Sequence, residues 1–128
     1  MKRILILGMG NAQVDAIQLC QKMGWEVHAC SHTGNGPGAL IAHYAAKMDI
    51  IDSVAVKEYV QSNKIDLVYS VGSDIAMPTV CKVSEDLELP HFISAQTAEI
   101  CNSKPRMRQA LGQEFSGNIP YQILSRLD

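Results

Sequence analysis

The chain has 128 residues, of which 47% are hydrophobic, 19% are charged and 5% are aromatic. This length suits one domain with a single, mainly aliphatic core, and the composition excludes a disordered or disulfide-stapled chain. Because the formal net charge is −2, the chain has no general attraction for phosphate backbones or anionic lipid, and we expect neither nucleic acid nor a membrane as partner.

The apolar run Ile4–Leu7 is far shorter than a signal-peptide core or a membrane-spanning helix, so we expect a cytoplasmic protein.

The four histidines share no ligand-like spacing. His32, on a glycine-rich loop, is the one placed to touch a substrate, although a solvated loop residue is the simpler interpretation. The cysteines form no Cys-x-x-Cys pair, and we expect reduced, mostly buried thiols at Cys20, Cys30, Cys81 and Cys101.

The first segments predict a strand, a glycine turn and a helix. Arg3–Leu7 is aliphatic without polar alternation, as expected for a central strand covered on both faces. The turn Gly8-Met9-Gly10-Asn11 follows, and the helix after it ends before Gly24, which suits the C′ position. Steps of three and four residues predict a helical stripe that faces the sheet, formed by Ala12, Ala16, Leu19, Cys20 and Met23.

Strands and helices alternate through the rest of the chain, with a glycine-rich loop over residues 32–38. Strands are predicted at Trp25–Ser31, near Ala45–Met48, and at Ile65–Val71, His91–Ile93 and Tyr121–Leu124. Helices are predicted near Ala39–His43, after a cap at Asp52 or Ser53, after Gly72-Ser73-Asp74, at Ala95–Cys101, and at Lys104–Leu111 after a cap at Ser103. This alternation predicts a Rossmann-like three-layer α/β/α sandwich with a parallel sheet, with any ligand at the carboxyl ends of the strands.

The glycine turn is the first candidate site. Backbone amides and the helix dipole at Gly8-x-Gly10 could hold a phosphate or a carboxylate, whereas the simpler interpretation is a tight turn without a ligand. A dinucleotide site would need a third glycine where Gln13 stands and an acidic residue near Ser31. Both are missing, which disfavours NAD or FAD but leaves another anion open.

In order and spacing, several short motifs resemble the N-terminal pre-ATP-grasp domain of ATP-grasp ligases, in the branch with the carbamoyl phosphate synthase large subunit, biotin carboxylase and formate-dependent phosphoribosylglycinamide transformylase. The resemblance covers nearly the whole chain. It rests on residues 4–11, 19–29, 37–39, 42–45, 64–68, 72–74, 89–90, 101–104 and 107–108. It implies a domain over residues 1–115, with residues 116–128 beginning the linker or strand that leads to an ATP-grasp domain outside this chain.

The resemblance also implies roles for individual residues. Gly8, Gly10 and Asn11 would approach the acceptor substrate, and the carboxylate of Asp74 could orient an amine. The alternative for Asp74 is an N-cap of the following helix. Lys104 matches a basic residue that relatives extend toward the ATP phosphates, although a lysine in a first helical turn is usually just solvated. No catalytic residue and no metal ligand is assigned.

The function implied is that of the substrate-side N-terminal domain of a carboxylate-amine or carbamoyl phosphate synthase-like ligase. ATP and Mg²⁺ would belong to the full-length enzyme, with none bound tightly by this chain, which should be inactive alone. Implied partners are a small carboxylate or amine substrate and the ATP-grasp domain, and the resemblance allows a homodimer. Two rivals stay open: a free-standing regulatory module that binds a small anion, and a nicotinamide-dependent oxidoreductase, which Gln13 and Ser31 disfavour.

Overall fold

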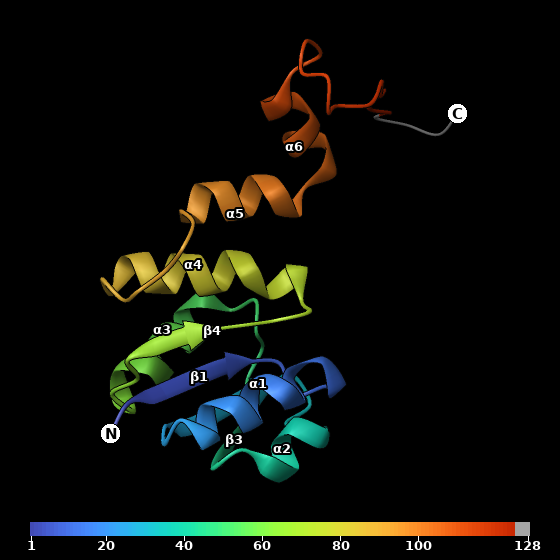
Figure 1. Ribbon diagram of the computed structural model, residues 1–128. Helices are drawn as coiled ribbons and strands as arrows, with labels where there is room; N and C mark the ends of the chain where they lie inside the picture. Colours follow the sequence, from blue (N-terminus) through green and yellow to red (C-terminus); the bar gives the residue numbers. More distant parts are fainter. Residues whose placement is uncertain (125–128) are drawn as a thin grey trace.

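Four parallel strands form the sheet at the centre of the computed structural model, which describes residues 1–124 (Figure 1). Their order is β3-β2-β1-β4, and every neighbouring pair runs in parallel. The central pair is in register from Arg3 opposite Glu26 to Leu7 opposite Cys30. The strands are β1 (Arg3–Leu7), β2 (Glu26–Ser31), β3 (Tyr44–Lys47) and β4 (Leu67–Tyr69). The parallel sheet expected from the alternation is therefore confirmed.

Two helices cover each face of the sheet. Successive side chains of β1 point to opposite faces, so this strand contributes to the core on both sides. Ile4 and Ile6 pack on the side of α1 (Asn11–Lys22) and α2 (Pro37–Ile41). Leu5 and Leu7 pack on the side of α3 (Ser53–Ser62) and α4 (Met77–Asp86), which follows the short 3-10 helix η1 (Asp74–Ala76). All four side chains are at most 2% exposed. This arrangement is the expected three-layer sandwich.

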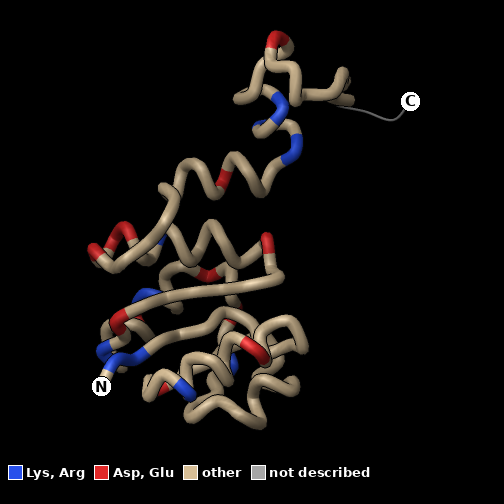
Figure 2. Tube along the Cα trace, viewed as in Figure 1, with Lys and Arg blue, Asp and Glu red and all other residues tan. Residues whose placement is uncertain are grey.

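Two further helices lie outside the three layers. Helix α5 (Ala95–Asn102) runs along α4 on the side away from the sheet, and α6 (Lys104–Leu111) lies beyond α5 (Figure 1). Ser103 caps α6 as expected, with its hydroxyl accepting from the Arg106 amide. Ala98 is the one buried residue of α5, and α6 has none. Acidic and basic residues are interspersed along the chain, and α6 carries several basic ones (Figure 2).

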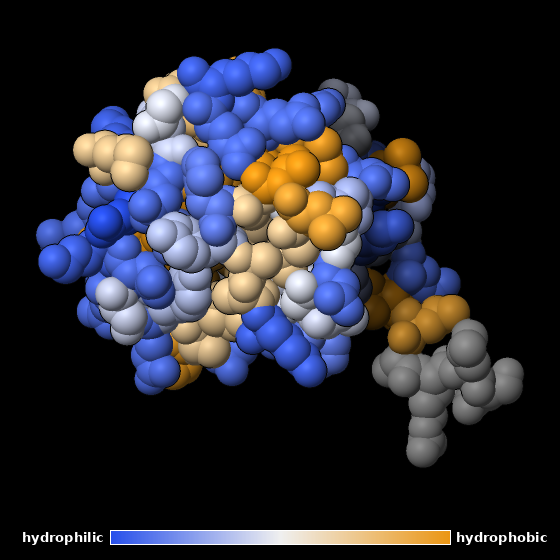
Figure 3. Space-filling model, turned by 90° about the horizontal axis from the view of Figure 1, so that it is seen from below, coloured by the Kyte–Doolittle hydropathy of each residue, from blue (hydrophilic) through white to orange (hydrophobic). Residues whose placement is uncertain are grey.

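The buried face of α1 differs from the predicted stripe. Gln13 and Ile17 are its buried residues, whereas Leu19 and Met23 are 59% and 56% exposed. The prediction weighed side chains by hydrophobicity alone, but a glutamine can be buried when both ends of its amide find hydrogen-bond partners, as Gln13 does. Seen from below, the surface is largely hydrophilic, with hydrophobic residues gathered in a strip and in smaller separate groups (Figure 3).

Two predicted strands are absent from the described residues. His91–Ile93 forms no ladder, and Phe92 is 70% exposed; Pro90 before it has no amide hydrogen to donate to a ladder. Tyr121–Leu124 is not paired either, because a strand needs a neighbour with which to exchange backbone hydrogen bonds. The expected linker extends to residue 128, and residues 125–128 lie outside the described part.

Other boundaries shift slightly. The short helix expected near 39–43 begins at Pro37, which suits a first helical turn, and the strand expected over 65–71 is limited to Leu67–Tyr69. Asp52 caps α3 as predicted, with its carboxylate accepting from the amides of Val54 and Ala55. Within residues 1–124, no helix is long and apolar enough to cross a membrane.

Candidate functional site

The carboxyl ends of three neighbouring strands are tied together at one edge of the sheet. The amide of Gly8, directly after β1, donates to the carbonyl oxygen of Cys30 in β2 at 2.8 Å. The buried hydroxyl of Ser70, directly after β4, donates to the carbonyl oxygen of Leu7 at 2.7 Å. Gly8 has a φ of +116°, a conformation that favours glycine. The glycine turn and the segment after β4 therefore lie beside each other.

Gln13 fastens these two segments with both ends of its side-chain amide. Its Oε1 accepts from the Gly10 amide at 2.8 Å, and its Nε2 donates to the carbonyl oxygen of Val71 at 2.5 Å. The side chain is only 5% exposed although it stands in the first turn of a surface helix. The segments also touch directly, since a Cβ placed on Gly72 would lie 2.8 Å from the Cβ of Ala12.

The Gln13 side chain occupies the space over the glycine turn. A Cβ placed on Gly8 would lie 2.8 Å from the Gln13 Cδ, and the Gly10 amide already donates to Gln13. A dinucleotide pyrophosphate needs that close approach and those free amides. The missing third glycine thus has a physical consequence in the fold. Of the three turn residues predicted to approach a substrate, Asn11 has an exposed side chain, while the Gly8 and Gly10 amides are both used internally.

The glycine-rich loop over residues 32–38 folds back onto the glycine turn. The Gly38 amide donates to the Met9 carbonyl oxygen at 2.9 Å, and a Cβ on Gly36 would come within 2.3 Å of the same oxygen. Gly36 has a φ of +135°, so both its conformation and its surroundings require glycine. His32 is exposed on this loop.

A pocket of about 280 Å³ opens beside the segment that follows β4. One side is formed by the segment after β4, by η1 and by the start of α4, and the other side by α5 and the loop before it. Its lining comprises Ser70, Gly72, Ser73, Asp74, Met77, Phe92, Ile93, Ala98, Cys101 and Asn102. This pocket lies at the carboxyl ends of the strands, and Asp74 is the predicted site residue that lines it.

Asp74 is exposed at the mouth of that pocket, and it is not the N-cap that the alternative interpretation required. Ser73 precedes η1, and Ala76 precedes α4. Within residues 1–124, the Asp74 carboxylate accepts no hydrogen bond and forms no ion pair. An acidic side chain in the first turn suits the helix dipole, and it leaves both carboxylate oxygens available to a ligand.

Lys104 lies elsewhere. It is exposed at the start of α6 and lines a separate cavity of about 300 Å³ with Pro105, Arg108 and residues 121–124. The structure therefore brings the glycine turn beside the segment that carries Asp74, but it does not place Lys104 in the same pocket. Asn102, two residues before Lys104, does line the pocket of Asp74.

Sequence reasoning missed the two features that shape this edge. In the sequence, Gln13 stands out only as the residue in place of a third glycine, and nothing in a single sequence indicates that its amide bridges two segments. The sequence predicts a strand at Phe92 and Ile93, whereas in the structure they form part of the pocket wall. The signal that could have located them is Pro90, which disfavours a paired strand at that point.

His28 and His43 both have hydrogen-bond partners within the fold. His28 is 3% exposed, its Nδ1 lies 2.9 Å from the Tyr59 hydroxyl, and its Nε2 lies 3.0 Å from Glu26 Oε1. This network sits at the opposite edge of the sheet from the pocket, since Glu26 begins β2. The Nδ1 of His43 accepts from the Val27 amide. No three His, Cys, Asp or Glu side chains within residues 1–124 form a metal-holding group.

The four thiols are free, and their burial varies. Cys30 and Cys81 are buried, Cys20 is half-buried and Cys101 is exposed, so the expectation of buried thiols holds for Cys30 and Cys81, in part for Cys20, and not for Cys101. Burial raises the pKa of the Cys30 thiol to about 12 and raises those of Cys81 and Cys20 as well. These three thiols therefore stay protonated at neutral pH.

Comparison with known proteins gives a consistent set of relatives, although no family model matches the chain. Formate-dependent phosphoribosylglycinamide formyltransferase from Herminiimonas arsenicoxydans is 26% identical over 126 residues, which are 98% of this chain and 31% of that protein. The enzyme of the same name from Vibrio parahaemolyticus is 27% identical over 128 residues, covering 98% of this chain and 32% of that protein. The chain thus spans about a third of the length of these relatives.

Solved structures share the fold. Phosphoribosylglycinamide synthetase from Anaerococcus prevotii superposes with a TM-score of 0.76 at 23% identity, over 86% of this chain and 28% of that one. N5-carboxyaminoimidazole ribonucleotide synthetase from Thermotoga maritima superposes with a TM-score of 0.69 at 23% identity, over 87% of this chain and 30% of that one. L-amino acid ligase from Bacillus licheniformis superposes with a TM-score of 0.67 at 19% identity, over 87% of this chain and 29% of that one. In sequence and in fold, the chain is therefore a homologue of the N-terminal pre-ATP-grasp domain of the ATP-grasp ligases.

Proposed function

We propose that this chain is the substrate-side domain of an ATP-grasp ligase that joins a carboxylate to an amine. The observation that carries the proposal is the extent of the match: 98% of the chain aligns with only 31% of a formyltransferase relative, and the matched part has the relatives' fold. The active enzyme is then a longer protein, of which this domain supplies one wall of the acceptor cleft.

In the reaction that the resemblance implies, ATP converts the carboxylate into an acyl phosphate. The amine nitrogen then forms the new C–N bond as the C–O bond to phosphate breaks, and inorganic phosphate leaves. The role we assign to this domain is to position the amine. The free carboxylate of Asp74 accepts hydrogen bonds from the amine and fixes the direction of its attack. Gln13 supports that position, because it holds Val71, at the start of the segment that carries Asp74, against the glycine turn.

The glycine turn contributes differently from the first expectation. Because the Gly8 and Gly10 amides donate to Cys30 and Gln13, we assign these two glycines to shaping the cleft wall rather than to holding an anion. Asn11 remains exposed at the start of α1, and we retain it as a direct substrate contact.

We assign ATP and Mg²⁺ to the full-length enzyme. Among the structural relatives, N5-carboxyaminoimidazole synthetase from Staphylococcus aureus was solved with ADP, and a biotin carboxylase domain from Hydrogenobacter thermophilus with MgADP and bicarbonate. Lys104 is the residue of this domain that we propose to extend toward the nucleotide phosphates. Its ammonium group is exposed at the start of α6, and Arg108 lines the same cavity, so the local charge suits phosphate.

The domain boundary belongs to the proposal as well. We place the Rossmann-like domain at residues 1–115 and the start of the linker at 116–128. The beginning of this linker is anchored on α6, where the Asn118 Nδ2 donates to the carbonyl oxygens of Gly112 and Arg108 at 2.8 and 3.1 Å. We propose a cytoplasmic enzyme, and light scattering tests the homodimer that the resemblance allows.

The free-standing regulatory module is not supported, because the relatives extend far beyond the matched part and the Gly8 and Gly10 amides are already used. Calorimetric titration of the 128-residue chain with MgATP tests whether the ATP site lies outside this chain. We expect no heat of binding at micromolar ligand. Micromolar affinity would show that this chain holds a nucleotide site of its own, and would overturn the proposal that the ATP site belongs to the full-length enzyme.

A further inference from the structure

We propose that the pocket beside Asp74 selects an amine that carries an apolar substituent, in preference to a phosphorylated acceptor. The inference rests on the proposed function, since it takes this pocket to be the acceptor site. It goes further in that it names the substrate class from the pocket's own chemistry.

The charge of the pocket is the first argument. Asp74 is its one acidic residue, and its lining contains no lysine, arginine or histidine. Phosphate recognition in proteins relies on such cations or on free backbone amides. In the neighbouring glycine turn, the amides of Gly8 and Gly10 both donate within the protein, to Cys30 and Gln13. A phosphate here would face a carboxylate with no cationic side chain to neutralise it, whereas an ammonium or amine group would find its acceptor.

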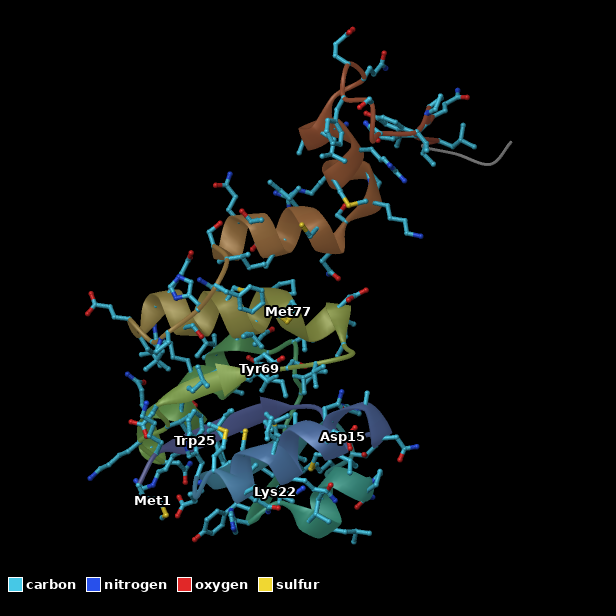
Figure 4. The ribbon with its side chains drawn as sticks, in the orientation of Figure 1. Met1, Asp15, Lys22, Trp25, Tyr69 and Met77 are labelled. Carbon is cyan, nitrogen blue, oxygen red and sulfur yellow. The ribbon has the colours of Figure 1, made fainter. Side chains whose placement is uncertain are left out.

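The apolar wall is the second argument. The apolar side chains of the lining are those of Met77 from α4, Phe92 and Ile93 from the loop before α5, and Ala98 from α5. Met77 stands at the start of α4, where it also packs against the core (Figure 4). Phe92 is 70% exposed, an unusual position for a phenylalanine in a small domain, and covering its ring would remove apolar surface from water. An aliphatic substituent next to the amine can provide that cover.

The size of the pocket and its remaining polar groups agree with a small ligand. About 280 Å³ lies just below the range of roughly 300–1,000 Å³ typical of pockets for drug-sized molecules. The Ser70 hydroxyl is already committed to the Leu7 carbonyl oxygen, so Ser73 and Asn102 are the neutral polar side chains left to contact the ligand.

Four small molecules separate the contributions of amine, apolar group and phosphate. Leucinamide has both the amine and the aliphatic group, glycinamide keeps the amine alone, 4-methylpentanamide keeps the aliphatic group alone, and ribose 5-phosphate carries the phosphate. Each is titrated into the ¹⁵N-labelled chain, and amide chemical shifts are followed. We expect leucinamide to shift Ser73, Asp74, Ala98 and Asn102, and to bind about tenfold more tightly than each of the other three.

Three variants test the assignment. Asp74→Asn should weaken leucinamide binding about tenfold, whereas the control Asp15→Asn, which changes an exposed carboxylate on α1 that does not line the pocket, should leave it unchanged (Figure 4). Phe92→Ala should weaken leucinamide but not glycinamide, and the exposure of Phe92 makes it safe for the fold.

The inference is overturned if ribose 5-phosphate or 4-methylpentanamide binds as tightly as leucinamide, if Asp74→Asn and Asp15→Asn behave alike, or if no ligand shifts these amides. None of these results would remove the proposal that the chain is the substrate-side domain of a ligase, because a pocket that prefers a phosphorylated acceptor still suits a ligase. Equal behaviour of Asp74→Asn and Asp15→Asn would remove the role assigned to Asp74. That proposal fails on a different observation, which is the absence of ATP-dependent ligase activity from the full-length gene product.

Discussion

Replacing Gln13 with leucine should loosen the edge of the sheet that carries the candidate site. Leucine is similar in size and keeps the apolar contacts of a side chain that is only 5% exposed, but it removes both amide hydrogen bonds. The Gly10 amide and the Val71 carbonyl oxygen then lose their partner. Both bonds are partly buried, so water can compensate in part, and each is worth about 1 kcal/mol. The expected loss is about 2 kcal/mol out of a total stability of about 5–15 kcal/mol.

Urea unfolding measures this loss, and amide hydrogen exchange locates it. Gln18→Leu is the matched control, because Gln18 is an exposed glutamine on the same helix, and its substitution should change stability by less than about 0.5 kcal/mol. In Gln13→Leu the Gly10 amide should also exchange faster than in the control. Equal unfolding midpoints for the two variants would refute the inference that Gln13 fastens the glycine turn to the segment after β4.

Three further predictions concern the glycine loop, the opposite edge of the sheet and the thiols. Gly36→Ala should cost at least about 1 kcal/mol more than Gly112→Ala in thermal or urea unfolding, because both glycines have positive φ but only the first would bring a Cβ within 2.3 Å of the Met9 carbonyl oxygen; equal costs would contradict this. The hydrogen bond from His28 lowers the pKa of Glu26, so this carboxylate stabilises the fold above its unfolded pKa of about 4.3, and that contribution is lost as pH falls through the folded pKa. In Glu26→Gln, the urea midpoint should therefore fall less steeply as pH is lowered. An unchanged dependence of the midpoint on pH would contradict the effect assigned to the His28–Glu26 hydrogen bond. Iodoacetamide followed by mass spectrometry should label exposed Cys101 first in the native chain, and early labelling of Cys30 would contradict its burial.

The sequence predicts the scaffold better than the site, for a physical reason. The aliphatic run of β1, the capping carboxylate of Asp52 and the C′ position of Gly24 are local signals, and each produced its element at or near the predicted place. Pairing of strands is not local. Residues 91–93 and 121–124 have the composition of strands but no ladder partner in the described chain.

The candidate site depends even more on long-range contacts. Asp74 could be proposed from its place after a strand, but its lack of a capping bond and its neighbours Phe92 and Asn102 follow only from the packing of α5 on α4. Gln13 shows the same limit, since the residue that disfavours a dinucleotide in the sequence also turns out to bridge positions 10 and 71.

The most direct test of the central claim is ATP turnover by the full-length gene product that contains this domain. The protein is incubated with MgATP, a panel of carboxylates and an amine such as leucinamide, and release of ADP is measured. We predict ADP release that depends on Mg²⁺ and rises when carboxylate and amine are present together, with Asp74→Asn raising the KM for the amine. A gene product that ends at Asp128, or one that releases no ADP under any of these conditions, would contradict the assignment to an ATP-grasp ligase.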